Sequence, residues 1–223
     1  MSMELTADQR RSLLDIARQT IRATLRAQDD SASADSTCFT DPVLRQPAGC
    51  FVTLHTLGEH RLRGCVGKLD SRDELVEAVR QSAQSVLQDP RFVTSPVVSD
   101  ELPGLELEIT VIFPLRPATS CVDFDPEIDG IYLTINDRSG CFLPQVARET
   151  GWGREQLLER LCSEKLGLAR TAWRDSGASA RLMKFHTLII GPEPFEPLGD
   201  ASATTLSSPL AAVEPGQQES TIH

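Results

Sequence analysis

The stretch GCFVTLHTLGEHRLRGCVG, residues 49–67, decides the fold of this 223-residue chain. It contains two apolar runs, residues 49–57 and 61–67, and only Gly58-Glu59-His60 separates them. A short connector that contains glycine between two runs of this kind predicts a β-hairpin. We therefore expect an antiparallel pair of strands at the centre of the fold.

Antiparallel pairing also predicts which residues of the hairpin are neighbours. Pairing outward from the connector places His55 opposite Arg63 and Thr53 opposite Cys65. A slip of one residue would move Thr53 and His55 to the other face, so their proximity depends on the register. Arg63 and Cys65 share a face in either register, because side chains alternate along a strand.

Helix and strand patterns continue on both sides of the hairpin. Thr6 and Gln9 form a capping-box pattern, and apolar residues then recur at every fourth position. A second capping-box pattern, residues 71–74, puts a helix N-terminus a few residues after Cys65. The expected elements are helices over residues 7–27, 75–89 and 154–166, strands over 105–113 and 180–190, and a second hairpin around 137–140.

Strands linked by hairpins and interspersed with helices are typical of an α+β domain with a mainly antiparallel sheet and flanking helices. No GxGxxG fingerprint follows a strand, and the sequence has neither a Walker A loop nor a GxSxG elbow. Three prolines between residues 192 and 197 end the regular pattern. We expect one domain over residues 1–197 and a disordered tail, rich in Ser, Thr, Ala and Pro, over residues 198–223.

The composition, 40% hydrophobic and 24% charged, describes an ordinary soluble globular protein. No apolar run approaches a membrane span, and the N-terminus lacks the core of a signal peptide, so we expect a cytoplasmic protein whose six cysteines stay reduced. No CxxC pattern occurs, and we expect neither a metal site nor a cofactor. The net charge of -10 disfavours a protein that coats nucleic acid, although residues 61–72 contain a basic cluster.

Cys65 is the first candidate for a catalytic residue. A nucleophilic thiol needs nearby positive charge, which Arg63, Lys68 and the following helix N-terminus would supply. Gly64 and Gly67 would leave room for a substrate, because glycine lets the backbone approach a ligand closely. A structural alternative stays open, since cysteine is often buried and glycines in strands often mark bulges.

The stretch LELEITVIF, residues 105–113, places Glu106 and Glu108 on one face of a strand. One of these carboxylates, with Glu108 as the candidate, would act as a general base or as a counter-charge to Arg63. His55 is the nearest base to Cys65 on the predicted hairpin. The alternative is that both carboxylates line the solvent-exposed face of an antiparallel strand.

The stretch LRGCVG, residues 62–67, closely resembles the LRGCIG signature of AMMECR1-domain proteins, the group that includes component A of the AmmeMemoRadiSam system. Val66 stands for the usual isoleucine, and Lys68 stands where a small residue is common. Further family-like segments follow in order over residues 8–196: GCFVTLH (49–55), DPRF (89–92), LPGLELEITVI (102–112), FLPQVARETGW (142–152), and LCSEKLGL followed by Trp173.

The resemblance implies a two-part α+β architecture, in which a smaller β-containing lobe forms a cleft near the signature strand. It also implies a bacterial component of a modification system whose partners are a Memo-like protein and a radical SAM protein, with no membrane partner. Together with the residue patterns, it gives a candidate site with catalytic Cys65, Arg63 and Glu108, and substrate-binding Gly64, Gly67, Lys68, Arg91 and Gln145.

Three functions of different classes are consistent with this sequence. The first is an enzyme or enzyme subunit in which Cys65 attacks or carries a substrate group. The second is an adaptor without catalytic activity, whose signature surface binds a partner protein. The third is a nucleotide or RNA binder that uses Arg61, Arg63 and Lys68, which the acidic net charge disfavours.

Overall fold

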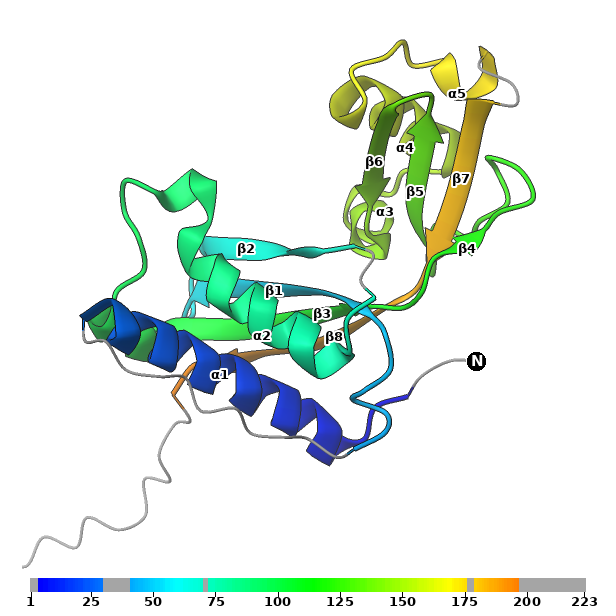
Figure 1. Ribbon diagram of the computed structural model, residues 1–223. Helices are drawn as coiled ribbons and strands as arrows, with labels where there is room; N and C mark the ends of the chain where they lie inside the picture. Colours follow the sequence, from blue (N-terminus) through cyan, green and yellow to red (C-terminus); the bar gives the residue numbers. More distant parts are fainter. Residues whose placement is uncertain (1–3, 30–40, 70–71, 176–178, 197–223) are drawn as a thin grey trace, which may run out of the picture.

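The computed structural model describes residues 4–29, 41–69, 72–175 and 179–196, and these residues form two lobes (Figure 1). The larger lobe contains a four-stranded antiparallel sheet with the order β2-β1-β3-β8. Helices α1 and α2 lie on one face of this sheet, and no described α-helix covers the opposite face (Figure 1). The elements of this lobe are α1 (Ala7–Asp29), β1 (Gly49–Thr56), β2 (Leu62–Lys68), α2 (Leu75–Ser85), β3 (Leu105–Ile112) and β8 (Thr187–Pro194).

The core of the larger lobe lies between its sheet and the two helices. On β1, Cys50, Val52 and Leu54 are fully buried in this core, together with apolar residues of α1 and α2. Their burial is the main stabilising term of the lobe, because removal of apolar surface from water dominates the favourable free energy of folding. Since side chains alternate along a strand, Thr53 and His55 point to the helix-free face.

The smaller lobe is inserted between β3 and β8. Its sheet has the order β4-β7-β5-β6, with all pairs antiparallel, and packs around a separate core that includes Leu133, Leu158 and Trp173. The predicted α+β class with a smaller β-containing lobe is therefore confirmed. The elements are β4 (Arg116–Pro117), β5 (Gly130–Ile135), β6 (Arg138–Phe142), α3 (Pro144–Thr150), α4 (Arg154–Arg160), a π-helical turn (Leu161–Lys165), α5 (Ala172–Asp175) and β7 (Ala180–Phe185).

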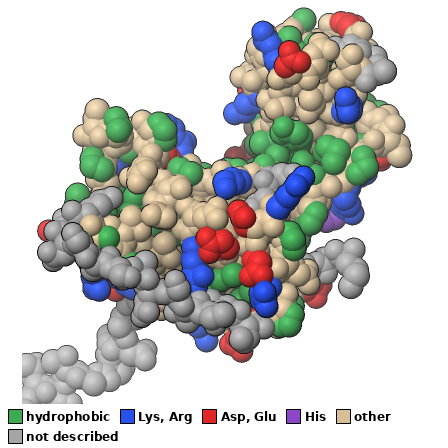
Figure 2. Space-filling view, viewed as in Figure 1, with side chains coloured by type: hydrophobic (Ala, Val, Ile, Leu, Met, Phe, Trp, Pro, Cys, Tyr) green, Lys and Arg blue, Asp and Glu red, His purple; other side chains and the backbone are tan. Residues whose placement is uncertain are grey.

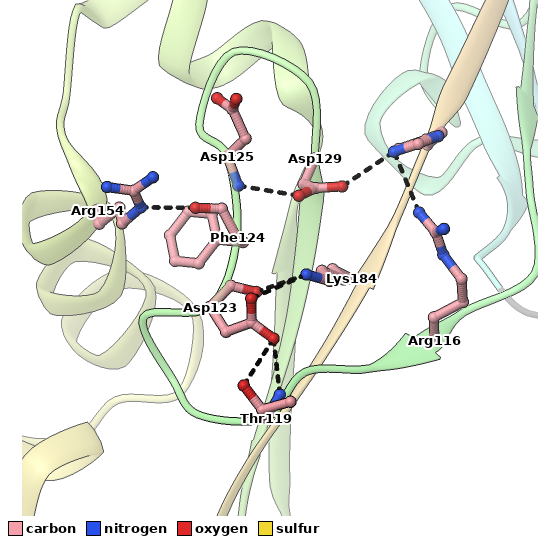
Figure 3. A network of polar contacts seen from close by, with 9 residues as sticks. Arg116, Thr119, Asp123, Phe124, Asp125, Asp129, Arg154 and Lys184 are labelled. Carbon is pink, nitrogen blue, oxygen red and sulfur yellow. Dashed lines mark hydrogen bonds and ion pairs between the residues drawn. The ribbon is translucent and has the colours of Figure 1, made fainter.

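Two chain segments join the lobes and pair with each other. The N–H of Phe113 donates to the C=O of His186 at 3.0 Å. Nearby, His186 Nε2 lies 3.1 Å from Asp129 Oδ1 and 3.1 Å from Arg116 Nη2 (Figure 3). The imidazole of His186 thus lies between a carboxylate and a guanidinium of the smaller lobe, at the point where the chain enters and leaves that lobe.

The structure confirms the predicted hairpin and corrects half of its register. Thr53 pairs with Cys65 as expected. The expected pairing of His55 with Arg63 is wrong: His55 pairs with Leu62, because a β-bulge interrupts the ladder just before His55. A bulge inserts one unpaired residue into a strand. Arg63 is that residue, and it lies on the outermost strand of the sheet.

Other predicted elements differ in their boundaries. The Thr6–Gln9 capping box is confirmed by two reciprocal hydrogen bonds, whereas the second capping box includes Ser71, which lies outside the described residues. Helix α2 ends at Ser85, and short 3-10 turns follow at Val86–Gln88, Pro90–Phe92 and Ser99–Gly104. The apolar run expected as one strand at 180–190 is two strands, β7 and β8, in different lobes.

The predicted disordered tail, residues 198–223, lies outside the described residues. Within the described ranges, none of the helices has the length and hydropathy needed to cross a membrane.

Candidate functional site

Cys65, Thr53 and Glu108 form a row across three neighbouring strands. Thr53 on β1 pairs with Cys65 of β2 on one side and with Glu108 of β3 on the other, so all three side chains point to the helix-free face. Thr53 Oγ1 donates to Cys65 Sγ at 3.4 Å. Neighbouring strands lie about 4.8 Å apart, so the backbones of Cys65 and Glu108 are separated by roughly 10 Å. The row therefore presents a sulfur and a carboxylate on one surface, with a hydroxyl between them.

Burial raises the pKa of the thiol at each of the other described cysteines. Burial raises the pKa of the Cys50 thiol to about 12. Burial also raises the pKa values of Cys121, Cys141 and Cys162. Because the thiolate is the reactive form, these shifts suppress the reactivity of all four thiols at neutral pH. Cys65 is half-buried and lies in the row with Thr53.

Asp89 and Arg91 hold the backbone of Cys65 at the outer edge of the sheet. The buried Asp89 Oδ2 accepts a hydrogen bond from the N–H of Cys65 at 2.9 Å, and Arg91 Nη2 donates to the C=O of Cys65 at 3.1 Å. The two side chains also form an ion pair at 2.6 Å, and this contact holds the pKa of Asp89 well below its usual range. The N–H and the C=O of Cys65, which lies on an edge strand, are thus both hydrogen-bonded within the protein. Arg91, a predicted substrate-binding residue, is engaged by these same contacts.

The C-terminal end of α2, and not its N-terminus, lies beside Cys65. A Cβ atom on Gly64 would lie 2.9 Å from the carbonyl oxygen of Val86, which directly follows α2. At the other end of the helix, Asp73 lies 3.9 Å from Nζ of Lys68, at the end of β2. The connection between β2 and α2 is short and the helix folds back along the strand. Contrary to the expectation from the sequence, the helix N-terminus does not lie at Cys65.

Arg63 is fully engaged by the segment that follows α2. Only 8% of the residue is exposed, and its guanidinium binds the carboxylate of Glu101 through Nε and through Nη2, the latter at 2.8 Å. Arg63 Nη2 also donates to the C=O of Ser95 at 3.2 Å, and the guanidinium lies 5.4 Å from the centre of the Phe92 ring. The contact with Arg63 lowers the pKa of Glu101. Arg63 therefore fastens residues 92–101 to the signature strand.

Of the remaining predicted substrate-binding residues, Gly67 and Lys68 line one pocket beside α2, and Gln145 lies in the smaller lobe. A Cβ atom on Gly67 would overlap the carbonyl oxygen of Cys50, so Gly67 permits a close approach of two strands. Lys68 Nζ donates to Gln81 Oε1 at 3.1 Å, and both residues line a pocket of about 250 Å³ between β2 and α2. Gln145 begins α3 in the smaller lobe, where its buried Oε1 has no hydrogen-bond partner among the described residues. None of these three belongs to the row on the helix-free face.

The two glutamates of β3 have different environments. Glu106 is buried, and its Oε1 lies 2.9 Å from Nδ1 of His60, so this carboxylate holds the turn of the hairpin. Burial raises the pKa of Glu108, and the nearby His55 and the hydrogen bond from Thr110 offset the rise only in part. A raised pKa on a partly buried carboxylate makes Glu108 a candidate for proton transfer.

Sequence reasoning missed the roles of Asp89 and Glu101. In the sequence, Asp89 is the first residue of the family-like segment DPRF and precedes a proline that stops a helix, but neither feature indicates a contact with Cys65. Glu101 is one acidic residue among several in a loop. The sequence pattern also left the face of His55 undecided; its Nδ1 is buried and has no hydrogen-bond partner within the described part of the chain. A search for groups of at least three metal-ligating side chains finds none among the described residues.

The fold and the site define a two-lobed α+β protein with a cysteine-containing signature on the edge strand of its larger sheet. Comparison with known proteins assigns that arrangement to a family: the AMMECR1 family model matches residues 14–189. The chain therefore belongs to the AMMECR1 family.

Individual relatives agree with this assignment. A protein of Methanothermobacter thermautotrophicus is 34% identical over 192 residues, which cover 83% of this chain and 95% of the relative. Protein TV1384 of Thermoplasma volcanium is 33% identical over 157 residues, covering 68% of this chain and 76% of the relative. The crystal structure of the uncharacterized protein PH0010 from Pyrococcus horikoshii matches with a TM-score of 0.64 and 29% identity, covering 78% of this chain and 88% of that chain.

Proposed function

We propose that the helix-free face around Cys65 is the catalytic or substrate-binding site of an enzyme or enzyme subunit, which acts in a modification system with a Memo-like protein and a radical SAM protein. The observation that carries the proposal is the row of Cys65, Thr53 and Glu108 on one face of the sheet, with Thr53 buried between the other two residues. The half-buried Cys65 is hydrogen-bonded to Thr53, and burial raises the pKa of Glu108 on the same face.

The spacing of the row defines the roles of its residues. Cys65 attacks or carries a group of the substrate, and the hydroxyl of Thr53 stabilises the thiolate by its hydrogen bond to sulfur. Glu108 lies two strands away, so it exchanges a proton with the substrate and does not take the proton of Cys65 directly. Arg63 is a positioning residue here, because Glu101 already neutralises its charge.

The same contacts disfavour a nucleotide or RNA binder. Arg63 and Arg91 are paired with Glu101 and Asp89, which leaves few cations near the signature for phosphate groups. On the face seen in Figure 2, the basic and acidic side chains of the described residues are interspersed and do not form a basic stripe. Binding of nucleic acid depends on clustered, unpaired Lys and Arg.

The surface next to the site also favours contact with a partner protein. Val93 and Val98 are 77% and 53% exposed, and both lie in the segment that Arg63 and Asp89 fasten to β2. Exposed apolar side chains close to a functional site are typical of an interaction surface. This segment is the place where we expect the Memo-like protein to bind.

Alkylation tests the role of Cys65. When the native protein is treated with iodoacetamide at neutral pH and the peptides are quantified by mass spectrometry, Cys65 should react at least about tenfold faster than Cys50, Cys121, Cys141 or Cys162. The reason is that burial suppresses the thiolates of those four residues. A Cys65 that reacts no faster than the buried cysteines would contradict the proposal.

Two threonine variants separate the effect of the hydroxyl from that of packing. Thr53→Val removes the donor to sulfur and should slow alkylation of Cys65 severalfold. Thr110→Val is the matched control, because Thr110 is also buried on a strand of this sheet but its hydroxyl lies 3.5 Å from Glu108. Equal rates in the two variants would show that the hydroxyl of Thr53 does not support the thiolate.

Size-exclusion chromatography tests the partner. The full chain and a Memo-like protein from the same organism should co-elute at micromolar concentration, and Val93→Asp should weaken the complex because it places a charge on the apolar surface. Val122→Asp is the control, since Val122 is an exposed apolar residue of the smaller lobe. If the wild-type proteins elute separately, or if both variants bind equally well, the proposed contact is wrong.

A further inference from the structure

The two outer strands of the larger sheet differ in how their free edges are covered. On β2, Asp89 and Arg91 occupy the main chain of Cys65. At the far end of β8, Arg18 of α1 donates to the C=O of Pro194 at 2.9 Å. Such contacts blunt an edge strand against pairing with another chain. Among the described residues, none makes such a contact with the main chain at the beginning of β8.

The main-chain groups of Thr187 and Ile189 point away from the sheet. The C=O of His186 accepts a hydrogen bond from Phe113, so the main chain of His186 faces the segment that continues β3. This orientation alternates along an antiparallel strand, so Thr187 and Ile189 direct their N–H and C=O groups to the open side of β8. Within residues 4–29, 41–69, 72–175 and 179–196, no group forms a hydrogen bond with these four atoms.

The open edge lies in a cleft of about 790 Å³ between the two lobes. Residues of β8 form one wall, the beginning of α1 and the residues before it form a second, and the smaller lobe forms a third. Apolar side chains come from all three walls, and they include Leu5, Leu188 and the 55% exposed Ile128. The cleft thus combines unpaired main-chain groups with apolar contact surface.

We propose that this edge binds an extended peptide as an additional strand beside β8. The main chain of the peptide hydrogen-bonds to Thr187 and Ile189, and apolar side chains at alternate positions pack against Leu188 and Ile128. Recognition by strand addition takes affinity from main-chain hydrogen bonds and specificity from pockets for alternate side chains. The proposal does not rest on the Cys65 site, which lies on the strand at the other edge of the sheet.

The shape of the cleft favours a single peptide over a second copy of this chain. The edge lies within the cleft, which Arg10 of α1 and Pro144 and Arg148 of the smaller lobe also line. In a dimer formed through β8, both edges would lie within such a cleft. They could not approach to the spacing of about 4.8 Å that strand pairing requires, whereas an isolated strand can enter the cleft.

Peptide selection followed by N-methylation tests the proposal. A display library of random heptapeptides is selected against the full chain, and the binding of the selected sequences is measured by fluorescence anisotropy. N-methylation should weaken binding at least about tenfold at every second residue, whose N–H faces β8, and have little effect at the residues between. Selection of no peptide, or an effect of methylation without a period of two, would overturn the proposal.

Protein variants locate the bound peptide. Ile128→Asp should weaken binding about tenfold and Val122→Asp should not, because only Ile128 of these two exposed residues lines the cleft. Ile189→Pro removes an outward N–H without removing a hydrogen bond to β3, so it should weaken binding while thermal stability changes little. Unchanged binding in both Ile128→Asp and Ile189→Pro refutes the site. A concentration-dependent dimer that Ile128→Asp disrupts would identify a second copy as the occupant and also refute it.

Discussion

Replacing Gly67 with alanine is expected to lower the free energy of unfolding by at least about 3 kcal/mol, the upper end of the usual range for overpacking. The added Cβ atom would overlap the carbonyl oxygen of Cys50 and lie 2.6 Å from Cα of Phe51. Both atoms belong to the backbone of β1, which pairs with β2 on one side and with β3 on the other. The clash therefore cannot be relieved by a side-chain rotation, and two ladders of the sheet must shift.

Gly104→Ala is the matched control for this prediction. Gly104 lies directly before β3, and a Cβ atom placed there meets nothing within 4 Å. This variant should change stability by no more than about 0.5 kcal/mol. The two variants are compared by urea denaturation at 25 °C, followed by circular dichroism. Similar midpoints for Gly67→Ala and Gly104→Ala would show that the sheet can accommodate a methyl group at residue 67.

The packing of the signature strand shows which residues of the signature have a structural role. Gly64 is required by the approach of Val86, and Gly67 by the approach of β1. Arg63 is required to hold Glu101. These three residues have structural reasons for their identity, and none of those reasons applies to the thiol of Cys65. The sulfur makes only a weak hydrogen bond, to Thr53, so the side chain of Cys65 is the member of the signature that packing leaves unexplained.

Much of the larger sheet could be predicted because strand alternation is a local property. Pairing the strands outward from the connector predicted Thr53 opposite Cys65, but next to the connector Thr56 bonds to Arg61 and His55 pairs with Leu62, and only the bulge at Arg63 brings Thr53 opposite Cys65. The alternation in β3 placed Glu108 on one face of its strand. Glycines in strands often mark bulges, and Gly64 directly follows Arg63, but the glycine alone did not give the position of the bulge. The bulge depends on Arg63, whose partners Glu101 and Ser95 lie in a distant loop.

The smaller lobe was expected from the family resemblance, but the point at which the chain returns from it to the larger lobe was missed, for a different reason. Residues 180–190 form one continuous apolar run, and the chain passes from β7 to β8 at His186 in the middle of it. A hydrophobic pattern indicates that a residue is buried, but it does not indicate whether the residue belongs to the core of the larger lobe or to that of the smaller lobe. The same limitation applies to the direction of α2: the apolar pattern of the helix predicted the buried face, but tertiary packing placed its C-terminal end beside Cys65.

Replacing Asp89 with alanine is expected to lower the free energy of unfolding by about 2–4 kcal/mol at pH 7. The carboxylate accepts hydrogen bonds from the N–H of Cys65 and from the backbone and guanidinium of Arg91. Its removal leaves the N–H of Cys65 without a partner at the edge of the sheet. The side chain of Arg91 is 54% exposed, so its charge returns to water, and the loss stays below that of a fully buried pair. Urea denaturation measures the change.

Asp89→Asn separates the charge of Asp89 from its shape. In the folded protein Arg91 holds the pKa of Asp89 below the unfolded value of about 3.9, so the stabilisation is complete above that pH and is lost as the pH falls further. The stability difference between wild type and Asp89→Asn should therefore be constant near neutral pH and shrink below about pH 4. The exposed Asp100→Asn is the control, with an expected change within about 0.5 kcal/mol. A difference that does not depend on pH would mean that hydrogen-bond geometry, and not charge, holds Cys65 at the edge of the sheet.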